Sequence, residues 1–142
     1  MIVVDTSALM AILQEEVQAP DCIAVLSGQQ RLISAVTMAE ALIVAMRRNV
    51  EEEMQALLDS LAMEVISATP AVTRQVVRAY RTWGKSRHPA GLNFADCFAY
   101  QLASERDLPL LYIGQDFART DIRSALQVPY SYGRADCRQS PS

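Results

Sequence analysis

Short apolar and β-branched runs alternate with longer segments of helical character along this chain. The apolar runs predict strands at 2–4, 31–36, 63–67 and 108–114. The segments between and after them predict helices at 8–16, from 20 onward, and at 37–48, 49–62, 70–84, 93–106 and 115–126. Because strands and helices alternate, we predict an α/β fold with a short central parallel sheet flanked by helices.

The length of the chain fits one domain. With 142 residues, 51% of them hydrophobic, the chain can bury a single core. We predict that this domain spans 1–134, with an edge strand beginning near Val128. The segment 135–142 is predicted to be a polar, flexible tail.

Charge and cysteine content argue against several classes of protein. Thirteen basic and sixteen acidic residues give a net charge of −3, unlike a protein that coats DNA by charge alone. Cys22, Cys97 and Cys137 are widely spaced, so we expect reduced thiols and neither a disulfide framework nor a zinc site. The sequence shows no signal-peptide pattern and no apolar run of the roughly 20 residues that span a bilayer. We therefore expect a cytoplasmic protein with no membrane association.

Acidic residues recur where predicted strands end and predicted helices begin. These residues are Asp5, Glu40, Asp96 and Asp116. Strand-to-helix junctions of a parallel sheet lie along its carboxyl edge, so we expect the four side chains to converge there. Carboxylates gathered in this way repel one another unless they hold protons or bind a cation. Mg²⁺ prefers such oxygen ligands, and the hydroxyls of Thr6 and Ser7 lie nearby in the sequence.

Each acid taken singly also has a structural interpretation. The segment "TMAE" at 37–40 matches a capping box, in which a hydroxyl residue and a later glutamate bind free backbone N–H groups. The segment "NFAD" at 93–96 has a similar outline, and Asp5 and Asp116 could each cap a helix. The spacing therefore leaves helix caps and metal ligands both open.

Basic residues gather on one segment that precedes the third acid. Arg74, Arg78, Arg81 and Lys85 are spaced by four, three and four residues, which predicts one helical face, and Arg87 follows in a loop. Such a face is either simply solvated or a track for a phosphate backbone that leads to the acidic edge. An acidic metal centre beside a basic track is what phosphodiester hydrolysis requires.

Four stretches of the sequence carry a family resemblance, namely "MIVVDTSAL", "RLISAVTMAEALIV", "GKSRHPAGLNFADCFAYQLA" and "LPLLYIGQDFARTDI". On these stretches the chain resembles the PIN-domain ribonucleases, and closely the toxins of the VapC type. The resemblance implies a PIN-like fold, cleavage of RNA with Mg²⁺ or Mn²⁺, and an acidic centre to which Asp5, Glu40, Asp96 and Asp116 map. It also implies a homodimer and a cognate VapB-type antitoxin. One departure is Ile113, which stands where relatives often carry lysine.

These observations combine into one hypothesis about roles. Asp5 and Asp96 are the principal metal ligands, and Glu40 and Asp116 complete the acidic pocket. Thr6 or Ser7 orients a water or a ligand, and Asn93 caps its helix and so holds the turn that carries Asp96. The aromatic residues of that helix are expected to pack in the core, although they could stack on bases; they are Phe94, Phe98 and Tyr100.

Two alternatives from other classes stay open on the sequence. One is a protein-binding module of the same PIN-like fold, in which the acids serve only as caps. The other is aspartyl-phosphate phosphotransfer with Asp5 as nucleophile, although Ser7 stands where such phosphatases usually carry a second aspartate.

Overall fold

A parallel four-stranded sheet forms the centre of the computed structural model, which describes residues 1–126. Its strands are β1 (Ile2–Val4), β2 (Arg31–Ser34), β3 (Glu64–Ile66) and β4 (Leu110–Leu111), in the order β3-β2-β1-β4. The helices are α1 (Thr6–Leu13), α2 (Ala19–Leu26), α3 (Ala35–Arg47), α4 (Glu51–Leu61), α5 (Pro70–Trp83), α6 (Phe94–Arg106) and the 3-10 helix η1 (Phe117–Arg119). The α/β class and the parallel sheet are thereby confirmed. The edge strand expected from Val128 and the tail at 135–142 lie outside the described residues.

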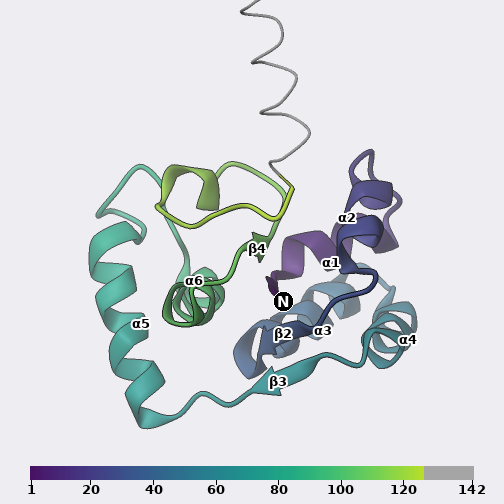
Figure 1. Ribbon diagram of the computed structural model, residues 1–142, viewed down its shortest axis with the longest axis horizontal. Coiled ribbons are helices and arrows are strands. Elements are labelled where there is room, and N and C mark those ends of the chain that lie inside the picture. Colours follow the sequence, from purple (N-terminus) through teal and green to yellow (C-terminus); the bar gives the residue numbers. More distant parts are fainter. Residues whose placement is uncertain (127–142) are drawn as a thin grey trace, which may run out of the picture.

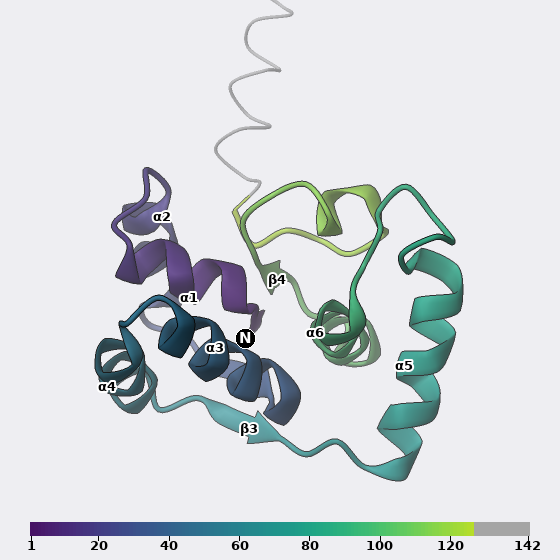
Figure 2. The same ribbon diagram turned by 180° about the vertical axis from the view of Figure 1, so that it is seen from behind.

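Helices cover both faces of the sheet (Figure 1). Alternate strand residues point to opposite faces, so Val3 and Leu32 pack with residues of α5 and α6, whereas Val4 and Ile33 pack with residues of α1 to α4. Strands β1, β2 and β4 are therefore largely buried on both sides, whereas the edge strand β3 is mostly exposed. Seen from behind, α1 and α3 lie side by side, and α5 and α6 stand across the sheet from them (Figure 2).

The helix after β2 begins earlier than the sequence predicts. Ser34, the last residue of the strand, is its N-cap and accepts a hydrogen bond from the backbone N–H of Val36. Thr37 consequently lies within the first turns of α3, where it is fully buried. The expected capping box at 37–40 is wrong, because a hydroxyl directly at the end of the strand caps the helix first.

The segment 115–126 is not the helix that its sequence predicts. Only Phe117–Arg119 form a 3-10 turn, which ends where the Thr120 hydroxyl donates to the Phe117 carbonyl oxygen at 2.7 Å. The chain then runs beside β4: Leu110 N–H donates to the Arg123 carbonyl oxygen, and Ala125 N–H donates to the Leu110 carbonyl oxygen. Bonding to the edge of the sheet replaces the bonds that a helix would have made within the segment.

No helix within residues 1–126 combines the length and the apolar character needed to cross a membrane.

Candidate active site

Asp5 lies at the carboxyl end of β1, in the middle of the sheet, and its side chain is 4% exposed. It is the N-cap of α1: its Oδ2 accepts hydrogen bonds from the backbone N–H of Ser7 at 3.0 Å and from the Ser7 hydroxyl at 2.7 Å. The Ser7 hydroxyl in turn accepts from the backbone N–H of Ile113 at 2.9 Å, which joins the ends of β1 and β4. The other oxygen, Oδ1, is buried without any hydrogen-bond partner. The capping role therefore gives hydrogen-bond partners to only one of the two carboxylate oxygens.

Glu40 is brought to Asp5 by the packing of α3 against α1. Its Oε1 accepts a hydrogen bond of 2.7 Å from the hydroxyl of Thr6, a residue that is 7% exposed. Glu40 lies in the second turn of α3 and takes no part in the cap of that helix, which Ser34 supplies. The structural interpretation of Glu40 as a cap is therefore wrong.

Asp96 approaches from α6, on the opposite side of the sheet. It forms a true capping box with Asn93: Asn93 Oδ1 accepts from the Asp96 N–H at 2.8 Å, and Asp96 Oδ2 accepts from the Asn93 N–H at 3.0 Å. The prediction that Asn93 caps this helix is confirmed. Because these bonds connect residues three apart, the spacing "NFAD" determines them locally.

One pocket of about 290 Å³ brings these acids together. Asp5, Glu40 and Asp96 line it together with Thr6 and Ser7. Three predicted carboxylates and both predicted hydroxyls therefore share one cavity, although they come from three separate helices and strand ends.

The fourth predicted acid is placed differently. Asp116 lies beyond β4 at the start of η1, is exposed, and does not line this pocket. Its side chain makes no capping hydrogen bond. Its charge is nevertheless close enough to influence Asp5 and Asp96. Asp116 thus lies at the margin of the acidic group.

Burial and mutual repulsion govern the protonation of the pocket. Burial raises the pKa of Asp5, against the effect of the hydrogen bonds from Ser7, and the Asp116 charge raises it further. Burial also raises the pKa of Glu40, which the Thr6 hydroxyl lowers and the charge of Asp5 raises. The pKa of Asp96 rises from 3.8 to about 7, through burial first and then the charges of the other acids. Such a site favours a proton or a cation over free negative charge.

The donor set fits a hard divalent cation. Every candidate ligand is an oxygen, and the buried Oδ1 of Asp5 lacks any other partner. Within residues 1–126 no group of three or more acidic, histidine or cysteine side chains lies close enough together to hold a metal ion by itself. An ion held here would therefore keep waters or take further oxygens from a substrate, as Mg²⁺ usually does.

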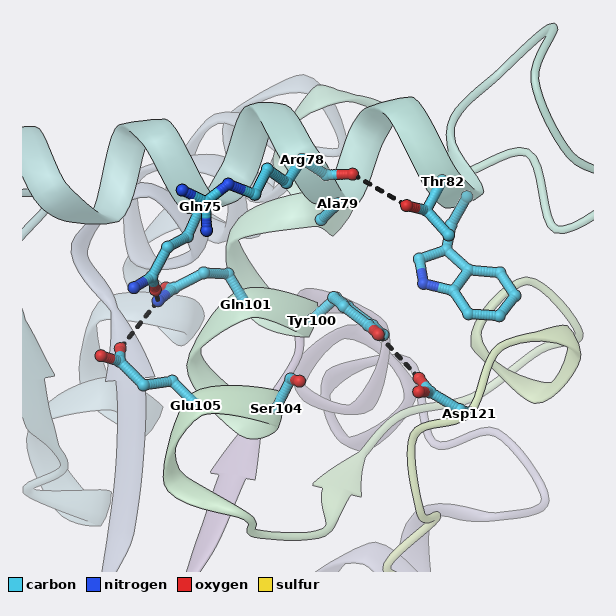
Figure 3. Close-up of a pocket in the computed structure, with 10 residues that line it drawn as sticks. Gln75, Arg78, Ala79, Thr82, Tyr100, Gln101, Ser104, Glu105 and Asp121 are labelled. Atoms are coloured by element: carbon cyan, nitrogen blue, oxygen red, sulfur yellow. Dashed lines mark hydrogen bonds between the residues drawn. The ribbon is translucent and has the colours of Figure 1, made fainter.

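The basic segment does not form the single face that its spacing predicts. All five side chains are exposed, but α5 ends at Trp83, so Lys85 and Arg87 lie beyond it. Arg78 lines a groove between α5 and α6 that also contains Glu105 and Asp121 (Figure 3). Two acids in that groove make it a poor track for phosphates.

Arg81 and Arg87 lie in a different groove, without any acid in its lining. They share it with Tyr80 and Phe94, and Phe94 is 68% exposed. The expectation that Phe94 packs in the core is wrong, because the first residue of α6 leaves its ring mostly exposed to solvent. Phe98 and Tyr100, one and nearly two turns further on, are buried as expected.

Glu16 also lines the acidic pocket, as do four residues that no pattern in the sequence had marked: Met10, Gln14, Val44 and Arg48. They follow the predicted site residues at helical spacing, since Met10 and Gln14 lie four and eight residues after Thr6. Val44 and Arg48 stand in the same relation to Glu40. This spacing becomes informative only when α1 and α3 are known to lie side by side.

Comparison with known proteins shows the family. Residues 2–123 match the PIN domain family. The chain belongs to the PIN-domain family. Ribonuclease VapC30 of Mycobacterium tuberculosis is 39% identical over 124 residues, covering 84% of this chain and 95% of the relative.

Solved structures share the fold. Mycobacterium tuberculosis VapC20, described as a Sarcin-Ricin loop cleaving toxin, superposes with a TM-score of 0.68 at 15% identity, over 86% of this chain and 96% of the other. A toxin-antitoxin complex from Klebsiella pneumoniae gives a TM-score of 0.66 at 18% identity, over 85% and 93%. The PIN fold and the resemblance to VapC proteins are confirmed by the family match and the relatives. At identities below 20%, the solved structures show similarity of fold only.

Proposed function

We propose that this protein is the ribonuclease toxin of a type II toxin–antitoxin pair, acting on RNA in the cytoplasm. The proposal assigns hydrolysis of the phosphodiester bond to the pocket of Asp5, Glu40 and Asp96, with Asp116 at its margin. The observation that carries it is the buried, unpartnered Oδ1 of Asp5 in a cavity that two further carboxylates share. The names of the VapC relatives support the class of reaction.

Asp5 and Asp96 would hold Mg²⁺ or Mn²⁺, and Glu40 would complete the site. A divalent cation bound there lowers the pKa of a water ligand and offsets charge on the departing oxygen. Thr6 fixes one oxygen of Glu40, so the other stays free to face the ion or an attacking water. Ser7 holds Oδ2 of Asp5, which leaves Oδ1, buried and without a hydrogen-bond partner, as the oxygen that the proposal assigns to the ion.

The family also suggests which partners this protein binds. The Klebsiella pneumoniae neighbour is a toxin-antitoxin complex, which supports a VapB-type antitoxin for this chain. Arg81 and Arg87, beside the exposed ring of Phe94, offer charge and a stacking surface to RNA close to the first turn of α6. A homodimer remains part of the proposal on family grounds.

The decisive experiment is cleavage of total RNA by the purified protein, with mapped ends. We expect cleavage with Mg²⁺ or Mn²⁺ and none in EDTA. Asp5→Asn should lower the rate by at least about 100-fold, since even residues that only support metal ligands cost 10–100-fold. Asp59→Asn, an exposed carboxylate on α4, is the matched control and should retain the rate. No cleavage with any metal, by a folded protein, would favour the protein-binding module.

A further inference from the structure

The acidic pocket extends into a groove between α1 and α3. Thr6, Met10 and Gln14 form one wall, each four residues after the last. The opposite wall carries Glu40, Val44 and Arg48 at the same spacing. Residues four apart lie above one another on a helix, so the two rows run along the same groove.

The far end of this groove is positively charged. Eight residues at 1.5 Å each place Arg48 about 12 Å along α3 from Glu40. Its guanidinium donates a hydrogen bond of 2.9 Å to Oε1 of Gln14, which holds it across the groove. The remaining N–H groups of Arg48 stay available to a ligand.

Arg48 forms no ion pair within the described part of the protein. The one ion pair found among residues 1–126 joins Arg123 and Asp107, elsewhere on the surface. Glu16 also lines the groove near this end, but it is exposed and forms no ion pair with Arg48. The groove thus has Asp5, Glu40 and Asp96 at one end and the apolar Met10 and Val44 in the middle. Arg48 lies at the other end, with Glu16 nearby.

We propose that this groove is a path for the RNA strand, in which Arg48 binds a phosphate that neighbours the scissile one. The proposal rests on the function proposed above, because it takes the acidic end as the place of cleavage. An arginine fork suits a phosphate, and the apolar side chains of Met10 and Val44 suit the ribose and base between the two phosphates. Arg48 is then a substrate-positioning residue.

A structural role for Arg48 predicts different behaviour. As the C-cap residue of α3, it could serve only to favour the helix dipole. Arg47, the last residue of the helix, is also exposed and shares that role, but it does not line the groove. Arg47→Gln is therefore a matched control for Arg48→Gln.

The test measures binding separately from cleavage. Binding of a fluorescent single-stranded RNA is followed by anisotropy over a series of salt concentrations, with Ca²⁺ as the cation. We expect Arg48→Gln to weaken binding roughly tenfold, as the loss of a charged hydrogen bond would. The slope of log affinity against log salt should fall by about 0.7, the value for one phosphate of a single strand. Arg48→Lys should keep most of the slope, and Arg47→Gln should match the wild type.

The position of the contact is tested by shortening the RNA. If Arg48 binds a neighbouring phosphate, that phosphate lies on one side of the cleavage site. Removing nucleotides from that end of the RNA should abolish the difference in affinity between wild type and Arg48→Gln, whereas shortening the other end should not. Equal affinity and slope for Arg48→Gln and Arg47→Gln would overturn the proposal, as would a groove that binds antitoxin but not RNA. Absence of cleavage by the wild type would count against the proposed function alone, since the binding measurement does not depend on it.

Discussion

Removing the charge of Asp96 tests how far electrostatic repulsion among the acids of the pocket destabilises the folded protein. Replacing it by asparagine preserves the shape of the side chain and an oxygen that can accept from the Asn93 N–H, so the cap of α6 should survive. The substitution removes a carboxylate whose pKa is raised to about 7 by burial and by the other acids. We therefore expect Asp96→Asn to stabilise the metal-free protein at alkaline pH while it impairs cleavage.

The magnitude follows from the two pKa values. The rise from 3.8 to about 7 corresponds to about 4 kcal/mol, at about 1.4 kcal/mol for each tenfold change in proton affinity. Because Asp96 is only partly buried, solvent screening reduces the expected gain to about 1–2 kcal/mol.

The sign of the pH dependence is fixed by linkage. The folded state binds the Asp96 proton more tightly than the unfolded state, so this group makes the protein less stable as pH rises from about 4 through 7. Below about pH 4 wild type and Asp96→Asn should be similar in unfolding free energy, and near pH 8 the variant should be more stable. Added Mg²⁺ should stabilise the wild type and have less effect on the variant.

Urea unfolding in EDTA across this pH range tests the prediction. Glu52→Gln, which removes an exposed carboxylate from the first turn of α4, serves as control and should not change the pH dependence in this way. The repulsion argument is refuted if wild type and Asp96→Asn have the same free energy of unfolding at pH 8. It is also refuted if the difference between their free energies of unfolding does not change with pH.

Two further predictions concern the residues that position the acids. Thr6→Val removes the hydroxyl that binds Glu40, and we expect cleavage to fall by about 10–100-fold with a loss of only about 1 kcal/mol in unfolding free energy, whereas Thr6→Ser should restore both. Equal cleavage by Thr6→Val and the wild type would show that this bond is dispensable. Asn93→Ala should cost about 1 kcal/mol in unfolding free energy through loss of the cap, with recovery in Asn93→Ser; an unchanged melting curve would contradict that role.

Local features of this protein could be predicted from its sequence. The alternation of apolar runs and helical segments predicted the parallel α/β fold, because the central strands β1 and β2 are largely buried on both faces. The cap formed by Asn93 and Asp96 was likewise predictable, since both hydrogen bonds span three residues. The position of Asp5 directly after a buried strand marked the site, because a charge there must find a partner.

The tertiary structure alone decided which side chains meet. Thr6 and Glu40 are 34 residues apart, and Ser7 and Ile113 are 106 apart. Neither hydrogen bond can therefore be predicted from the spacing of residues along the chain. The pairing of α1 with α3 also determines that the groove ends at Arg48 and not on α5, where the basic spacing pointed. Short-range hydrogen bonds are set by the order of residues, whereas a pocket depends on which helices pack together, and that choice is made by burial over the whole core.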